Sequence, residues 1–347
     1  MPHPAPYRIR SAIAWLLAGC AAFFAAWRAG TSQSPAPSSG ELSAYYEGSI
    51  SPLLDAAELR DREAANAALS RLHDHFQQFH AGIPAFAEDI TGWGTRFGIV
   101  GRSVKDLWTK FWDNPATATA TKDYVNTKFR AHIVSEEKLQ RAVTDALSTF
   151  RDSVAANHNR MLAEIKLALS MPECPVRIPS FRLDGLLHNA AASAGELAIK
   201  QGGDNVLQTA ALLAGGVAAD MAANRMVAAL FARLAATTAA TIATEGTAAA
   251  GATATGGAAG TAAGPVGTVI GIGVGIVASV IMDWWMTDSF KTKLHEQCGA
   301  FLSTLEREIT AGNATAPGLR KALEDSAAAN HAAFRKSLSR DFIDPLP

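Results

Sequence analysis

The histidines and cysteines of this sequence, which could bind a metal ion or act as nucleophiles, are spaced in a way that suits neither task. Residues two apart on a helix point to different sides, which argues against chelation by the neighbouring histidines His73, His75 and His80. The three cysteines, Cys20, Cys174 and Cys298, are too scattered for a zinc site or a disulfide framework. We therefore predict no catalytic, cofactor-binding or metal site, and we expect that the protein is not an enzyme.

Cys20 is the exception, because its neighbours are typical of a processing site. Leu17-Ala18-Gly19-Cys20 follows two arginines and an apolar run, and it resembles the lipobox of bacterial lipoprotein signals. That resemblance implies that Cys20 becomes lipid-modified and the first residue of the mature chain. The residues after Cys20 stay apolar as far as Trp27, whereas mature lipoproteins usually continue with polar residues. In either case Cys174 and Cys298 could form a disulfide, although we favour two buried free thiols.

The same segment is also consistent with an uncleaved signal anchor, which is the interpretation we favour. Residues 1–10 form a positively charged cytoplasmic segment, and residues 11–28 are just long enough to span a hydrocarbon core. Residues 29–40 are rich in Ser, Pro and Gly and predict a flexible linker. Both interpretations place the protein at the cell inner membrane, with the following domain on the periplasmic side.

Residues 41–180 are predicted to form a domain of long amphipathic helices, arranged as a bundle or in a coiled-coil-like manner. Ser135 is a good N-cap, and an apolar stripe at steps of three and four residues runs from Leu139 to Leu169. His158 falls within this stripe, where we expect a core polar residue that finds a hydrogen bond. A stripe of this length needs a partner helix from this chain or from another copy, so we expect a homo-oligomer.

One segment of this domain places large aromatic residues on one narrow helical face. It runs from Trp93 to Trp112, and its basic residues lie off that face, as in helices that lie on a membrane surface. We favour a bundle helix with small residues for close approach, and we keep membrane contact as the alternative. In that alternative the contact residues are Trp93, Trp108 and Trp112.

The strongest apolar block lies in the last third of the chain. Residues 181–243 predict an Ala-rich helical region, of which Val206–Ala243 is expected to pack against protein, and residues 244–264 predict an Ala/Thr/Gly low-complexity loop. Residues 265–286 predict a membrane-embedded helix, with a buried helix inside a soluble bundle as the alternative. Small residues at every fourth position form a glycine zipper, and tryptophans follow where an interface would lie. The predicted contacts are Gly267, Gly271, Gly275, Ser279, Trp284 and Trp285.

Two further apolar stripes occupy residues 287–347. They are separated by the turn-forming stretch from Gly312 to Pro317, so we expect an antiparallel helical hairpin that helps to complete the bundle. The predicted fold class of the whole chain is therefore all-α. The charge count leaves open how many segments span the membrane and on which side this tail lies.

Charge and composition limit the function classes. The net charge is −1 and no basic run occurs, which argues against nucleic acid as a partner. Our first hypothesis is a non-catalytic envelope scaffold or assembly factor that contacts the lipid bilayer and self-associates through its stripes and zipper; no protein partner is indicated. The alternative is a membrane-active protein, whose apolar region from Val206 to Met282 resembles in general architecture the hydrophobic hairpin of pore-forming colicins. A third is a lipoprotein with a soluble helical domain.

Overall fold

The computed structural model describes most of the long helices predicted from the sequence. The described residues are 38–97, 115–175, 227–232, 234, 264–284, 289–313 and 316–343. They are almost entirely helical, which confirms the all-α class. Besides turns and helix ends, the exceptions within these ranges are two short strands that pair antiparallel, β1 (Gly312–Asn313) and β2 (Ala316–Pro317).

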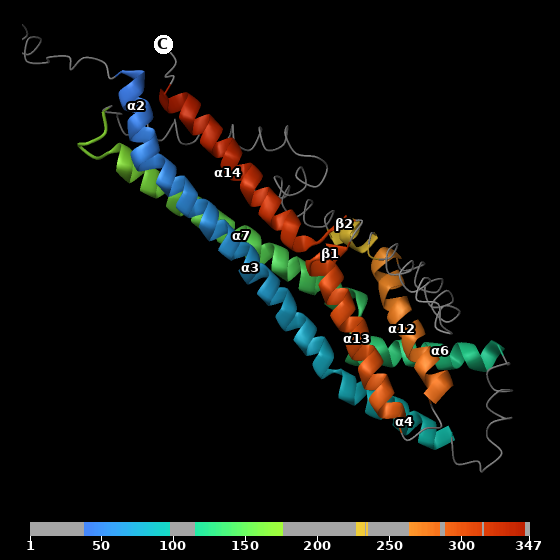
Figure 1. Cartoon of the computed structure of the whole chain (residues 1–347). Helices are drawn as coiled ribbons and strands as arrows, with labels where there is room; N and C mark the ends of the chain where they lie inside the picture. Colours follow the sequence, from blue (N-terminus) through green and yellow to red (C-terminus); the bar gives the residue numbers. More distant parts are fainter. Residues whose placement is uncertain are drawn as a thin grey trace, which may run out of the picture.

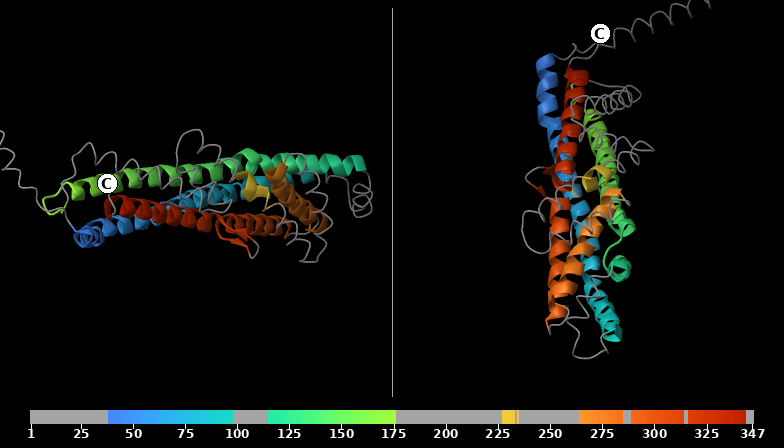
Figure 2. Two further views of the ribbon diagram at one scale, coloured as in Figure 1. Left: turned by 90° about the horizontal axis from the view of Figure 1, so that it is seen from above. Right: turned by 90° about the vertical axis from the view of Figure 1, so that its right-hand side faces the viewer.

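The helices form an elongated rod (Figures 1 and 2). In chain order they are α2 (Ser39–Tyr45), the π-helix η1 (Tyr46–Ile50), α3 (Ser51–Ala81), α4 (Ile83–Phe97), α6 (Pro115–His132), α7 (Glu136–Leu169), α12 (Gly264–Trp284), α13 (Phe290–Thr310) and α14 (Leu319–Ile343). Helices α3 and α7 lie side by side and run antiparallel, since Arg60 pairs with Glu164 while His75 pairs with Asp145. The α2–η1–α3–α4 series has almost no interruption and extends about 90 Å at 1.5 Å per residue.

Serine side chains start two of these helices. Ser38 and Glu41 form a capping box at α2, in which the Ser38 hydroxyl accepts from the Glu41 N–H and the Glu41 carboxylate accepts from the Ser38 N–H. The Ser135 hydroxyl accepts a hydrogen bond of 3.3 Å from the Lys138 N–H at the start of α7. The prediction that Ser135 is the N-cap of this helix is therefore confirmed.

A glycine sets the corner between α3 and α4. A side chain at Gly82 would collide with the carbonyl group of His132 at the end of α6. Without a Cβ atom, the corner can lie directly against α6, and this contact brings Phe86 of α4 to Phe129 of α6. Their ring centroids are 5.8 Å apart and the rings are nearly perpendicular, which is a favourable aromatic geometry.

The buried apolar residues fall into two groups, which we name the main core and the terminal core. The main core joins α4, α6, α12 and α13 to α3 from Ala64 onward, to α7 as far as Val154 and to α14 as far as Ala327. Val227, Phe231 and Leu234 also belong to it. The terminal core consists of Leu42, Tyr46, Ile50, Leu54, Ala57, Met161, Ile165, Leu169, Cys174, Ala333, Phe334, Leu338 and Phe342.

The predicted C-terminal hairpin is not the arrangement observed. Helices α13 and α14 follow one another along α3, because Glu306 of α13 contacts His73 whereas His331 of α14 contacts Asp61. The β1–β2 turn leaves the rod and returns, so that Gly318 touches the end of α13, where a Cβ atom would collide with the backbone. The chain therefore resumes its original direction instead of folding back (Figure 1). Within the described residues, α13 packs antiparallel to α12.

The cysteines that the structure describes are free thiols. Cys174 lies in the terminal core and Cys298 in the main core, and both are buried. Burial raises the pKa of the Cys298 thiol to about 12, so this thiol stays protonated at neutral pH. The preference for two buried free thiols over a disulfide is confirmed.

Candidate functional site: the packing of α12

Helix α12 is the most apolar helix of the rod and lies inside it. Its contacts are with α13, α6 and α7. Seven of its apolar side chains belong to the main core or are buried beside it: Val269, Ile270, Ile272, Val274, Val277, Ala278 and Val280. These positions surround most of the helix circumference, so α12 buries nearly all its faces. Val266 and Ile276 are half-buried against the same core.

Aromatic rings form the surface on which α12 rests. A Cβ atom at Gly273 would lie 2.7 Å from the ring of Phe301 of α13 and 3.0 Å from that of Phe129 of α6. These two rings also contact each other, with centroids 6.2 Å apart. Together with Phe86 they form a chain of rings that joins α4, α6 and α13 beneath α12. We call Phe86, Phe129 and Phe301 the aromatic cradle.

The predicted zipper residues lie in or near this packing. Gly267 and Gly275 are buried, and Gly271 is half-buried. Ser279 is buried, and its hydroxyl donates a 2.7 Å hydrogen bond to the Ile276 carbonyl within the same helix. Other helices approach closely at Gly273, which lies between two zipper positions. Contact of the zipper with a second copy or with lipid stays a prediction.

Most of the predicted tryptophan contacts, and the lipidation site, lie outside the described residues. They are Trp108, Trp112, Trp285 and Cys20. Trp93 lies within α4 and Trp284 is the last residue of α12, and only their backbones are described. The structure nevertheless brings α4 and α12 to the same end of the rod (Figure 1). The start of the first predicted membrane-contact region, in α4, therefore lies at the same end of the rod as α12.

No helix among the residues that the structure describes is both long and apolar enough to cross a membrane.

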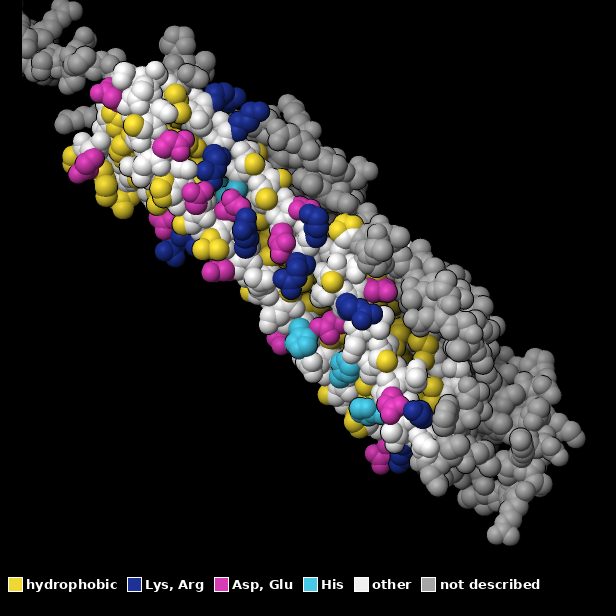
Figure 3. Space-filling model, viewed as in Figure 1, with side chains coloured by type: hydrophobic (Ala, Val, Ile, Leu, Met, Phe, Trp, Pro, Cys, Tyr) yellow, Lys and Arg dark blue, Asp and Glu magenta, His cyan; other side chains and the backbone are white. Residues whose placement is uncertain are grey.

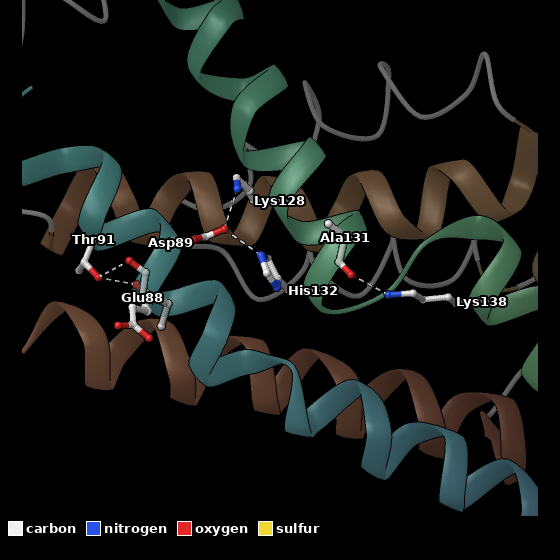
Figure 4. Close-up of polar contacts among 8 residues, drawn as sticks. Glu88, Asp89, Thr91, Lys128, Ala131, His132 and Lys138 are labelled. Carbon is white, nitrogen blue, oxygen red and sulfur yellow. Dashed lines mark hydrogen bonds and ion pairs between the residues drawn. The ribbon is translucent and has the colours of Figure 1, made fainter. Parts of the chain in front are cut away.

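A polar cluster joins α4 to α6 beside the cradle (Figure 4). The Asp89 carboxylate accepts a 2.7 Å hydrogen bond from the Lys128 ammonium group, and the same oxygen lies 2.8 Å from His132 Nε2. These contacts hold the pKa of Asp89 below its ordinary value and raise that of Lys128. Next to the cluster, Lys138 donates to the Ala131 carbonyl and so ties the start of α7 to the end of α6. The cluster fixes the helices that form the cradle.

Comparison with known protein families, curated proteins and solved structures finds no match to this chain.

A second polar cluster lies inside the rod, between the main core and the terminal core. Its members come from three helices: Asp61 from α3, Asn157 and His158 from α7, and His331 from α14. Sequence reasoning identified His158 as a core polar residue but missed Asp61 and His331. A usable signal existed, because each residue interrupts the apolar stripe of its helix at one position.

The predicted surface histidines have ordinary polar partners. His73 Nδ1 lies 2.6 Å from Glu306 of α13, and His75 Nε2 lies 3.1 Å from Asp145 of α7. Figure 3 shows histidines beside charges of both signs on the described face that includes α3 and α13. In the part of the chain that the structure describes, no group of three or more His, Cys, Asp or Glu residues is arranged to hold a metal ion.

The chemistry supported by the α12 site is therefore one of packing. The cradle binds an apolar helix by shape, and the polar cluster around Asp89 fixes the helices that carry the cradle. Such a site can store α12 within the protein, and a change that opens the cradle would expose a long apolar surface.

Proposed function

We propose that this protein is a non-catalytic scaffold or assembly protein of the cell envelope, a rod tethered through its N-terminal segment. The supporting observation is that the rod has two different ends (Figure 1). At one end the rings of Tyr45 and Tyr46, where α2 passes into η1, contact Phe342 near the end of α14. At the other end lie α4, α6 and α12. The predicted linker of residues 29–40 leads directly into α2, so the tether would hold the terminal-core end.

The reach and stiffness of the rod suit this role. The α2–α4 series alone has a summed helical length of about 90 Å, with one corner at Gly82. Long helices packed antiparallel along most of the rod resist bending, because bending would separate side chains that are buried between them. A tethered rod of this kind would hold its cradle end at a set distance from the membrane.

The apolar stripe of α7 supports packing within the chain more than self-association. Every residue of the stripe is buried against this chain: Leu139, Val143, Leu147, Phe150, Val154, Met161, Ile165 and Leu169. A second copy could reach them only after the bundle opened. The proposal therefore does not rely on the α7 stripe for a homo-oligomer.

Membrane fractionation of the full chain tests the tether. We expect the wild-type protein to stay in the membrane pellet after a carbonate wash. Leu17→Arg should release most of it, because a charge in the middle of a span costs about 2.5–3.5 kcal/mol, whereas the control Leu17→Ile should not. Cys20→Ser separates the two kinds of tether, since it abolishes attachment only if the lipid is the anchor. Release of the wild-type chain into the soluble fraction would contradict the proposal.

A second candidate function, a membrane-active protein, is supported by the burial of α12. The most apolar helix of the rod is held by α13 and α6 close to α4, whose sequence is the start of the predicted membrane-surface segment. Opening the cradle would present both regions to a bilayer together. In this function the rod is the storage form and the inserted α12 is the active form.

Dye leakage from liposomes of phosphatidylethanolamine and phosphatidylglycerol tests this candidate. If the candidate holds, the full chain releases the dye and Ile276→Lys does so poorly. Ile276 is only half-buried, so the folded rod should tolerate the lysine, whereas insertion of α12 should not. The matched control is Thr292→Lys, an exposed position on α13. Intact liposomes at saturating wild-type protein would rule this candidate out.

A further inference from the structure

One level of the rod contains a polar layer where apolar packing would be expected; two of its residues, Asp61 and His331, are buried, and the other two are half-buried. We call Asp61, Asn157, His158 and His331 the polar layer. On α3 the terminal core ends at Ala57 and the main core begins at Ala64, and Asp61 lies between them. On α7 the corresponding limits are Val154 and Met161, and on α14 they are Ala327 and Ala333. The polar layer therefore separates the two cores on all three helices.

Hydrogen bonds join the three helices within the layer. The Asn157 amide donates a 2.9 Å hydrogen bond to one Asp61 oxygen, and His331 Nε2 lies 2.8 Å from the other. Asp61 is 2% exposed and His331 is 5% exposed, so these contacts are shielded from water. Each Asp61 oxygen thus makes a polar contact with a different helix.

His158 completes the layer next to this network. Its ring lies 5.4 Å from the ring of Phe334, nearly perpendicular to it, and Phe334 belongs to the terminal core. The titratable groups whose charges act on His158 are Asp61 of α3 and His331 of α14. Burial lowers the pKa of His158 below 6.5, the neighbouring His331 lowers it further, and Asp61 partly opposes both.

On the terminal side of the layer, α14 is held by apolar packing and by Arg335, whose side chain donates to Ser51 and Asp55 and whose carbonyl accepts from the Tyr46 hydroxyl. Phe334, Leu338 and Phe342 pack there. The buried hydroxyls of Ser337 on this side and of Ser326 on the main-core side have no hydrogen-bond partner among the described residues. A buried hydroxyl without a partner costs about 1–3 kcal/mol. The ion pair between Arg335 and Asp55 is largely exposed on the Asp55 side and adds little.

We propose that the polar layer is an acid-sensitive hinge. When His158 takes up a proton, the part of α14 beyond His331 separates from α3 and α7, and the terminal core opens while the main core stays folded. A charged His158 would sit beside His331, and the one nearby carboxylate, Asp61, already has both oxygens in use. The added charge therefore lacks a free partner and is relieved by exposure to water.

The direction of the pH effect follows from the depressed pKa. The unfolded chain binds a proton at His158 near pH 6.5, whereas the folded chain does so only at lower pH. The stabilising contribution of neutral His158 is thus fully present above pH 6.5 and is lost as the pH falls toward the folded value. The opening is expected in mildly acidic solution.

Hydrogen exchange of the full-length protein between pH 7.5 and pH 5.0 tests the hinge, after correction for intrinsic exchange rates. In the wild-type chain, residues 332–343 of α14 should lose protection by more than about threefold at a pH where residues 69–79 of α3 keep theirs. His158→Gln should remove this selective loss. His80→Gln is the matched control, because His80 is also half-buried with a pKa lowered by burial, but it lies against the main core.

The outcomes separate the hinge from a general loss of stability. Selective opening that disappears in His158→Gln and persists in His80→Gln supports the proposal. Equal protection of α14 at all pH values, simultaneous opening of both cores, or an unchanged response in His158→Gln overturns it. If His158→Gln does not fold, His158→Asn replaces it, and the order in which the two cores open in the wild-type chain still decides.

Discussion

The main core and the terminal core share α3, α7 and α14 but are held together by different forces. The main core relies on shape, with the rings of the aromatic cradle and backbone contacts at Gly82 and Gly273. The terminal core has two tyrosines whose hydroxyls donate to backbone carbonyls, Tyr45 to Ala168 and Tyr46 to Arg335. Burial raises the pKa of both tyrosines, which keeps these groups protonated as donors.

This difference indicates that the two ends of one bundle can respond to different conditions. Apolar packing and the hydrogen bonds of the two tyrosines are both insensitive to mild acid, whereas the protonation of His158 in the polar layer depends on pH. The polar layer lies where one kind of core gives way to the other. The rod can therefore have one end that is permanently folded and one that opens, if the two cores unfold separately.

The largest test compares two matched phenylalanines, Phe129 of the main core and Phe334 of the terminal core. Both are fully buried. Each truncation to Ala should lower the unfolding free energy of the core that contains the residue by about 3–5 kcal/mol. Phe129→Ala should lower the free energy of global unfolding in urea. Phe334→Ala should mainly reduce the hydrogen-exchange protection of α2 and α14.

The same two variants can also contradict the idea that the two cores unfold separately. If Phe334→Ala reduces the protection of the main core as much as that of the terminal core, the rod is one cooperative unit. The polar layer would then be a structural feature without a hinge.

Gly82→Ala tests the contribution of close backbone packing to the main core. The new Cβ atom would overlap the His132 carbonyl, a backbone group that cannot rotate away. We expect a loss of about 1–3 kcal/mol in the free energy of unfolding. The control is Gly48→Ala, where nothing lies within 4 Å of the added atom, and it should be neutral or stabilising by up to about 1 kcal/mol. Equal effects in both variants would contradict the close-packing role of Gly82.

Local patterns predicted the long helices well, and the reason is physical. The start of α7 at Ser135 and its stripe to Leu169 depend on capping and periodicity, which are properties of neighbouring residues. The in-line arrangement of α13 and α14 depends on the contact of Gly318 with the end of α13. A turn-forming stretch predicts a change of chain direction, but it does not predict that the chain turns back and resumes its original direction.

The candidate sites were harder to predict, for two reasons. A helix that is apolar on all sides is expected both in a membrane and in a protein core, so the pattern of α12 does not distinguish these environments. In the polar layer, Asp61 and His331 are separated by 270 positions in the sequence. The sequence shows that each residue interrupts an apolar stripe. Only the packing of α14 on α3 brings the two residues together.

Tyr46→Phe tests a single hydrogen bond of the terminal core. The substitution removes the hydroxyl that donates to the Arg335 carbonyl and keeps the ring that contacts Phe342. We expect a loss of about 1 kcal/mol, seen as faster hydrogen exchange in α14. Tyr124→Phe in α6 is a comparison at the main-core end, and it should leave the exchange of α14 unchanged. An unaffected α14 in Tyr46→Phe would show that the ring alone anchors this helix.

The smallest expected effects concern the carboxylates on the surface of each end. Glu164 accepts hydrogen bonds from Arg60 of α3 and Arg160 of α7, and these lower its pKa below 4.5. Its contribution to stability is present above pH 4.5 and is lost as the pH falls through the folded value, so Glu164→Gln should reduce the acid sensitivity of the terminal core. Exposed ion pairs of this kind contribute about 0.2–1 kcal/mol.

Asp89→Asn is the counterpart at the main-core end, because Lys128 and His132 lower the pKa of Asp89 below 3.8 in the same way. Thermal unfolding of both variants from pH 7 to pH 3 should show similar, small changes that begin only below about pH 4.5. The hinge at His158 begins to respond as the pH falls below 6.5, because the pKa of the folded His158 is lowered by burial, and both carboxylates are still charged when this response begins. Any difference in stability between the two ends at pH values above about 4.5 is therefore attributed to the polar layer. If Glu164→Gln removed that difference, surface ion pairing would control the terminal core, and His158 would not.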